Sequence, residues 1–169
     1  CGLELKRAKA RVNPGIPFAL TDRVRDRIKQ MLPFKPTGAQ KRVLGEIAHD
    51  MAQPHPMYRL LQGDVGSGKT IVAALAALQC VENGYQVALM APTEILAEQH
   101  YAKFSAWLTP LGIEVLWLSG ATKKSERKQL LTSIAQGAAP VVVGMMFSAA
   151  ARLRRQSLCG TSASRWSLV

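Results

Sequence analysis

Eight consecutive residues carry the strongest chemical signal in this sequence, because glycines, a lysine and a hydroxyl stand at the spacing of a phosphate-binding loop. They are Gly63, Asp64, Val65, Gly66, Ser67, Gly68, Lys69 and Thr70. Glycine lets backbone N–H groups approach phosphate oxygens closely, and a helix that begins here directs its positive end toward the anion. Lys69 would supply a mobile cation for the β and γ phosphates, and the Thr70 hydroxyl would bind Mg²⁺. We predict that all eight residues bind a nucleotide and that Lys69 and Thr70 also act in catalysis.

Two polar residues in and before this loop each have two interpretations. The Asp64 carboxylate could help to place a metal ion or water, but solvent exposure or a hydrogen bond within the loop explains an Asp here equally, and we favour that explanation. The Gln40 amide could read an adenine edge, or it could act with Thr37 as the second half of a capping box that starts a helix. The sequence leaves both roles of Gln40 open.

A second candidate site follows a predicted strand at residues 91–100. Thr93 and the backbone N–H groups after it stand at a helix N-terminus that could hold a phosphate, including a phosphate of DNA. Taken alone, the segment predicts only a capped helix. We interpret His100 as a residue on the surface of that helix.

Further basic and aromatic residues have a commoner explanation than nucleic-acid binding. A basic group could track a DNA backbone, although a solvated charged face is the more usual origin of such a group; it consists of Lys123, Lys124, Arg127 and Lys128. Three aromatic residues fall inside periodic elements, so we predict that they pack as core or half-buried residues and do not stack on bases; they are Tyr101, Trp107 and Trp117.

Composition narrows the class of protein. The 169 residues include 22 Lys and Arg against 11 Asp and Glu, a formal charge of +11, which favours a polyanionic partner such as nucleic acid. Loss of an acidic part of a longer protein would leave the same charge. The three cysteines lie far apart with no C-x-x-C pair, which suggests neither a zinc site nor a disulfide framework. Since disulfides are typical of oxidising compartments, we expect a location in the reducing cytoplasm. No apolar run approaches the roughly 20 residues that span a bilayer, so we expect no membrane partner.

The elements that must position these residues alternate as in a parallel α/β fold. We predict helices at 26–32, 37–51, 69–83, 93–108 and 125–136, and strands at 58–62, 87–90, 113–118 and 141–143. The corresponding organisation is a basic, irregular linker at 1–26, a nucleotide-binding domain with an incomplete parallel sheet at 27–144, and a divergent, disordered or frameshifted tail at 145–169. The first residue is not Met, and no Asp or Glu follows Glu126, so we expect a fragment of a longer protein.

Three segments together are similar to the RecG family of bacterial ATP-dependent DNA helicases, which are superfamily 2 motors: residues 32–40, 62–70 and 91–100. The resemblance extends over about 16–144. It implies a RecA-like first motor domain, ATP bound at the loop, and remodelling of branched DNA such as forks and four-way junctions in recombination and repair. It also implies that Thr93 and Glu94 grip a DNA strand and that Gln40 belongs to the adenine-binding segment.

The sequence departs from the family pattern after Gly144, where the family continues with Thr-His and this chain has Met145 and Met146. The family then carries an Asp-Glu box that binds Mg²⁺, which the tail cannot supply, and a second motor domain, which we expect to be missing here. The alternative to a motor is therefore a non-catalytic nucleotide-binding or nucleic-acid-binding module without hydrolysis, and we expect a monomer. A P-loop kinase or transporter ATPase fits the loop but leaves residues 91–100 unexplained.

Overall fold

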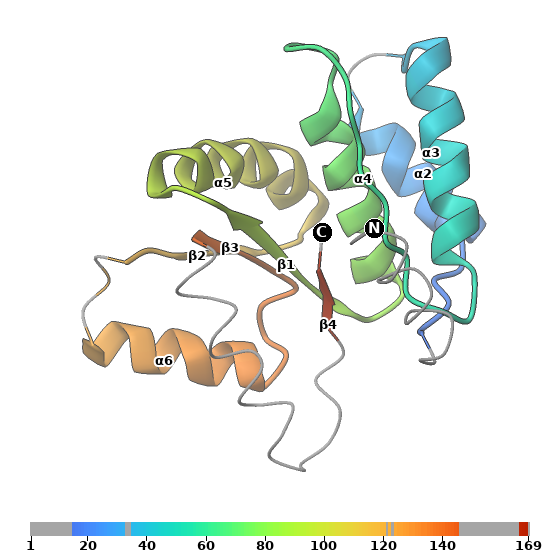
Figure 1. The fold of residues 1–169 in the computed structure, drawn as a ribbon. Coiled ribbons are helices and arrows are strands. Elements are labelled where there is room, and N and C mark those ends of the chain that lie inside the picture. The colour runs from blue at the N-terminus through green and yellow to red at the C-terminus, as the bar shows by residue number, and fades with distance from the viewer. Residues whose placement is uncertain (1–14, 33–34, 121, 123, 146–165, 169) are drawn as a thin grey trace, which may run out of the picture. The chain divides into compact units, whose positions relative to one another are not determined.

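The computed structural model describes residues 15–32, 35–120, 122, 124–145 and 166–168, and Figure 1 shows the helices and strands that they form. The chain divides into two compact units, Cys1–Gln79 and Cys80–Val169. Among the described residues, no helix has the length and the apolar character needed to cross a membrane.

The first unit opens with helix α2 (Asp22–Met31), which begins four residues earlier than its sequence pattern indicates. The Thr21 side chain caps the helix by accepting a hydrogen bond from the Val24 backbone N–H at 3.3 Å. This local cap outweighs the basic composition that suggested an irregular linker to residue 26, so that prediction is wrong for residues 22–26. Residues 1–14 of the expected linker lie outside the described residues.

Helix α3 (Gly38–Met51) confirms its predicted bounds and its predicted start. Thr37 Oγ1 accepts from the Gln40 N–H at 3.2 Å, and Gln40 Oε1 accepts from the Thr37 N–H at 3.0 Å. Each side chain therefore satisfies a backbone donor that the first turn leaves without an intrahelical partner, which is the reason the helix starts here.

Apolar side chains of both helices form the core of the first unit together with the segment before α2. Phe18, Val24, Met31, Ile47 and Met51 are all buried. The Phe18 N–H donates to the Met51 carbonyl at 2.8 Å, so the backbone itself fixes the chain entering α2 to the end of α3.

The strand predicted at 58–62 does not form: these residues belong to no helix or strand. Tyr58 is 48% exposed and Leu60 66% exposed, so the alternate side chains that a strand would bury remain in solvent. A strand is stabilised by a paired neighbour and a buried face, and a short apolar stretch in the sequence supplies neither. The loop at 63–68 is thus preceded by irregular chain and followed by α4 (Lys69–Glu82).

The second unit is a parallel sheet with helices on both faces (Figure 1). In chain order its elements are β1 (Gln86–Ala91), α5 (Glu94–Leu108), the 3-10 turn η1 (Thr109–Leu111), β2 (Val115–Leu118), α6 (Lys124–Ala135), β3 (Val141–Met145) and β4 (Trp166–Leu168). The strand order is β2-β3-β1-β4, and every pairing is parallel. The α/β class and the elements predicted between residues 87 and 143 are confirmed.

Side chains of β2, β3, α6 and the turn after α6 form a core beside the sheet. Leu118, Ile134, Ala139 and Val142 form one buried cluster. Buried Gln86 donates its amide to the carbonyls of Ile134 and Ala139 at 3.0 and 2.9 Å, which joins the start of β1 to the end of α6 without leaving a buried amide unpaired.

The segment from Met145 onward is described only in part. Met145 is the last residue of β3, and residues 166–168 form β4 alongside the start of β1. Residues 146–165 and 169, where we expect a divergent tail, lie outside the described residues.

Candidate nucleotide and nucleic-acid sites

The glycine-rich loop owes its shape to two glycines in the left-handed region of backbone space. Gly66 has φ +82° and Gly68 has φ +87°, values that residues with a Cβ rarely adopt. Between them the Ser67 N–H donates to the Asp64 carbonyl at 3.2 Å and closes a tight turn. The eight predicted loop residues therefore lie together at the N-terminus of α4, where its first N–H groups lack intrahelical partners.

Lys69 is directed back over this loop. Its Nζ donates to the Gly63 carbonyl at 2.6 Å and to the Asp64 carbonyl at 2.7 Å. An ammonium held by two carbonyl oxygens at the start of a helix is a cation that a phosphate group can attract, since carbonyls neutralise none of its charge. The donor set of the loop thus fits a polyphosphate. The Asp64 carbonyl contributes here, while its carboxylate is on an exposed residue, and the role of that carboxylate remains a prediction.

Gln40 reaches the loop from α3. Its Oε1 completes the capping box, and its Nε2 donates to the Ser67 carbonyl at 3.0 Å. The helix-cap interpretation of Gln40 is confirmed, and a contact with the loop itself is added that sequence reasoning missed.

The start of α5 brings together the second pair of predicted site residues. Thr93 Oγ1 accepts from the Leu96 N–H at 3.3 Å and caps the helix. The Glu94 carboxylate accepts a short hydrogen bond from Ser119 Oγ and a second from the Gly120 N–H at 3.2 Å. Because β1 and β2 run parallel to β3 in the same sheet, these residues lie at the shared carboxyl edge of the strands. This edge is where ligands of open α/β sheets bind.

Comparisons with known proteins identify the class. A model of the DEAD/DEAH box helicase family matches residues 37–164. This chain belongs to the DEAD/DEAH box helicase family. Membership of this helicase family implies the use of ATP.

Individual relatives agree with the family. RecG, the ATP-dependent DNA helicase of Escherichia coli (strain K12), is 56% identical over 128 residues, which are 76% of this chain and 18% of that protein. RecG of Haemophilus influenzae is 54% identical over 129 residues, 76% of this chain and 19% of the relative. A solved structure of RecG bound to a three-way DNA junction aligns with a TM-score of 0.82 at 37% identity, covering 99% of this chain and 22% of that one.

The resemblance to RecG helicases that the three sequence segments carry is confirmed by these relatives. The chain spans about a fifth of their length. The matched range of the DEAD/DEAH box helicase model extends past residue 144, into the part that departs from the RecG pattern in sequence.

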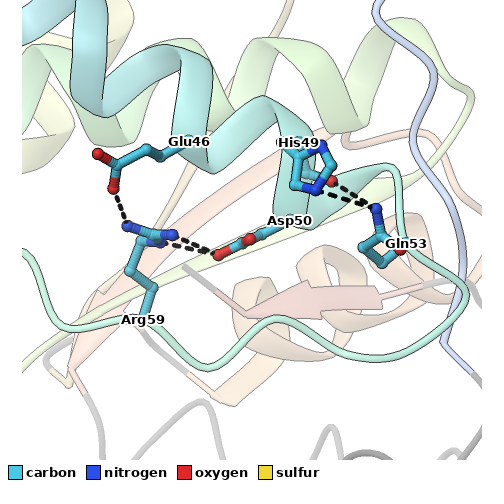
Figure 2. Close-up of polar contacts among 5 residues, drawn as sticks. All are labelled: Glu46, His49, Asp50, Gln53 and Arg59. Carbon is cyan, nitrogen blue, oxygen red and sulfur yellow. Dashed lines mark hydrogen bonds and ion pairs between the residues drawn. The ribbon is translucent and has the colours of Figure 1, made fainter.

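An ion-pair cluster in this helicase chain was missed by sequence reasoning (Figure 2). Arg59, in the irregular segment before the loop, donates to Glu46 at 2.6 Å and to Asp50 at 2.6 and 2.9 Å. Hydrogen bonds to Asp50 and Glu46 raise the pKa of the Arg59 guanidinium. Two carboxylates four residues apart on one helix repel each other. That spacing in the sequence signals a cation partner, although it does not say which one.

The end of α3 also holds a contact between His49 and Gln53. Gln53 Nε2 lies 3.4 Å from His49 Nε2 and donates to the His49 carbonyl at 3.4 Å (Figure 2). These are long contacts that follow the turn at the helix end and give His49 no catalytic partner.

The basic group on α6 is described in part. Lys123 and the Lys124 side chain lie outside the described residues, Lys128 is exposed, and Arg127 Nε is buried with no hydrogen-bond partner within the described part of the chain. The role of this group in DNA contact stays a prediction.

The aromatic residues pack as predicted. Tyr101 and Trp117 are half-buried with ring centroids 5.5 Å apart. The ring centroids of Trp107 and the buried Phe104 are 6.4 Å apart.

His100 differs from the surface position expected for it, because its Nδ1 is buried without a partner among the described residues. Burial lowers the pKa of His100, and the positive charge of Lys103 lowers it further. No three His, Cys, Asp or Glu side chains of the described residues gather to hold a metal ion.

Proposed function

We propose that this chain is the ATP-binding portion of a RecG-type DNA helicase or translocase that acts on branched DNA. The observation that carries the proposal is the loop at residues 63–70, with two left-handed glycines and the Lys69 ammonium at the start of α4. The family, and RecG relatives at more than 50% identity, support a helicase rather than a P-loop kinase or transporter.

In this proposal the loop holds the phosphates of ATP. The backbone N–H groups at the start of α4 face the anion, and Lys69 exchanges its two carbonyl partners for phosphate oxygens. The Thr70 hydroxyl, on a half-buried residue one position into the helix, would bind Mg²⁺. When bound, the ion neutralises charge that develops on the phosphates.

Branched DNA is the proposed partner. A solved relative, RecG, is bound to a three-way DNA junction, and the formal charge of +11 favours a polyanion. Thr93 and Glu94 lie at the carboxyl edge of the sheet, where a strand of DNA would meet the start of α5. A cytoplasmic location and a monomeric state complete the proposal.

The second candidate function is nucleotide binding without turnover. It is favoured by the sequence after Glu126, which contains no Asp or Glu to align an attacking water. The two functions share the loop and differ only in hydrolysis.

The test is nucleotide binding and ATP hydrolysis by the purified chain, with and without branched DNA, beside a Lys69→Ala variant. Binding of a fluorescent ATP analogue that Lys69→Ala weakens at least tenfold is the expected result, since a charge-assisted contact is lost. DNA-stimulated turnover that the variant lacks would favour the motor, and binding without turnover would favour the second function. Absence of nucleotide binding by the unmodified chain would refute both.

A further inference from the structure

The segment that leads into the glycine-rich loop is fastened to the first unit by one side chain. Residues 57–62 belong to no helix or strand, and the hydrogen bonds that the structure describes for them all belong to the Arg59 side chain (Figure 2). The neighbouring side chains of Tyr58 and Leu60 are exposed, so packing on either side of Arg59 does little to hold the backbone. The position of this segment therefore depends on what Arg59 binds.

Arg59 binds two carboxylates on one face of α3. Its Nη1 donates to Glu46 at 2.6 Å, while its Nε and Nη2 donate to Asp50 at 2.9 and 2.6 Å. The planar guanidinium binds both partners at once, which a compact ammonium could not do in the same geometry. Helix α3 is itself fixed at both ends, by its capping box and by the hydrogen bond from the Phe18 N–H to the Met51 carbonyl. The segment is thus attached to a helix that is already held in place.

The anchor lies close to the start of the loop. Residues 60–62 alone separate Arg59 from Gly63, and an extended chain spans at most about 3.6 Å per residue. The carbonyls of Gly63 and Asp64 hold the Lys69 ammonium, and in the proposed function Lys69 leaves them for phosphate oxygens. The Arg59 contacts then remain to hold the chain that enters the loop.

We propose that Arg59 is a positioning residue for the phosphate-binding loop, and that its ion pairs with Glu46 and Asp50 keep the entry to the loop in place while Lys69 contacts the nucleotide. A segment that is ordered before binding loses less conformational freedom when the ligand arrives, so the affinity is higher. In this role Arg59 acts through the backbone and does not touch the ligand. The inference rests on the proposed nucleotide binding.

Two variants of the full 169-residue chain separate position from charge. Arg59→Met removes the ion pairs together with one positive charge. The double variant Glu46→Ala and Asp50→Ala removes the same ion pairs together with two negative charges, and Ala preserves the helix. If Arg59 acted by its charge, the first change would weaken the binding of an anion and the second would strengthen it. If Arg59 acts by position, both changes weaken binding.

Ile47→Val is the matched control for stability. Ile47 is buried on α3 beside Glu46 in the sequence, and removal of one methylene destabilises the first unit without changing its charge. Arg59→Lys is the conservative variant, because it keeps the charge and loses the planar fork that binds two carboxylates.

The measurement is the Kd for ATP and for inorganic tripolyphosphate, with thermal unfolding of each variant as the check on folding. Arg59→Met and the double variant should each weaken both ligands roughly fivefold, the upper end of what a partly exposed ion pair contributes. Arg59→Lys should lose less than Arg59→Met. Ile47→Val should lower Tm and leave each Kd within about twofold.

Unchanged or tighter binding by the double variant would show that Arg59 acts by its charge, and would overturn the inference. Unchanged affinities in Arg59→Met would overturn it as well. A loss in Ile47→Val equal to that in Arg59→Met would do the same, because lower stability alone would then explain the loss. All of these outcomes leave the proposed function intact. Failure of the unmodified chain to bind either ligand would instead remove the proposed function together with the inference.

Discussion

The glycine-rich loop and the start of α5 are both helix N-termini with an oriented polar side chain, yet they present opposite charges. At the loop, the Lys69 ammonium rests on two neutral carbonyls. At α5, the Glu94 carboxylate already occupies the Ser119 O–H and the Gly120 N–H, two donors that could otherwise bind a phosphate. The first region thus presents a cation whose described partners are neutral, and in the second a carboxylate of the chain itself accepts from the donors.

This difference separates two ways in which a helix N-terminus can serve an anionic ligand. The shape of the loop comes from its glycines, and the Lys69 charge remains available to an anionic ligand. The loop residues are therefore predicted to contact the ligand directly. At the start of α5, the Glu94 carboxylate accepts from the backbone of the chain after β2. The first effect of Glu94 is therefore on the local structure. The resemblance assigns it to DNA, while its geometry ties it to Gly120.

The largest effect is expected from Gly68→Ala. Ala at φ +87° is strained, and its Cβ would displace the Gln40 amide, so we expect a loss of about 2 kcal/mol in unfolding free energy and at least a tenfold loss of nucleotide affinity. Urea unfolding and nucleotide titration measure the two quantities.

Gly84→Ala is the matched control for Gly68→Ala. Gly84 has φ +80° with nothing within 4 Å of an added Cβ, so only the backbone term of about 1 kcal/mol remains and nucleotide affinity is unchanged. Equal losses at the two glycines would show that close packing around Gly68 adds nothing.

A smaller effect, about 1 kcal/mol in urea unfolding, is expected from Glu94→Ala, which removes the carboxylate that accepts from Ser119 and Gly120. Glu94→Gln retains an acceptor and should lose less. Equal losses would mean that the charge acts on the helix dipole and the hydrogen bonds contribute little.

In a titration with branched DNA at low salt, both variants should bind at least as well as the unmodified chain, because a negative charge is removed. Weaker binding by Glu94→Gln would make the carboxylate a DNA-binding group and end the contrast with Lys69.

Local signals in the sequence placed much of this structure. The Thr37 and Gln40 pair gave the start of α3, and the β-branched run at 141–143 gave a buried strand. The eight-residue loop was found from residue type and spacing alone, because its contacts are made within a few residues. Each of these features depends on neighbours along the chain.

Features that depend on distant partners were missed. The segment 58–62 is a short apolar stretch that forms no strand, and Arg59 within it pairs with Glu46 and Asp50 of α3. The Nε2 contact of Gln40 spans 27 positions, and Glu94 meets Ser119 across 25. Nothing in the order of residues says which carbonyl or hydroxyl a long side chain will reach once the elements pack.

The Arg59 ion pairs extend the comparison to the segment that precedes the glycine-rich loop. In this segment, Arg59 is bound to two carboxylates of α3. Arg59→Met should cost about 1 kcal/mol in urea unfolding, since the side chain is 28% exposed and leaves Glu46 and Asp50 facing each other. The difference should shrink in 0.5 M salt, roughly three times the ionic strength of about 0.15 M at which the screening length is already about 8 Å.

Lys29→Met is the control for Arg59→Met. The Lys29 and Asp26 side chains are 75% and 65% exposed, so their ion pair should contribute almost nothing. A loss in Arg59→Met that does not depend on salt would point to packing of the side-chain stem and away from charge.

The smallest effect is expected from His100 on α5, and it is a dependence on pH. Burial lowers the pKa of His100 in the folded chain, with Lys103 adding to the shift, so the unfolded chain binds the proton first as the pH falls. Stability should therefore be unaffected above pH 7 and should decline as the pH drops below about 6.5, the ordinary value for His. The decline is limited because the ring is only half-buried. His100→Asn, neutral throughout, should remove this part of the decline in thermal unfolding scans between pH 8 and 5. Parallel curves for the variant and the unmodified chain would show that His100 keeps its ordinary pKa on folding, and would contradict this prediction.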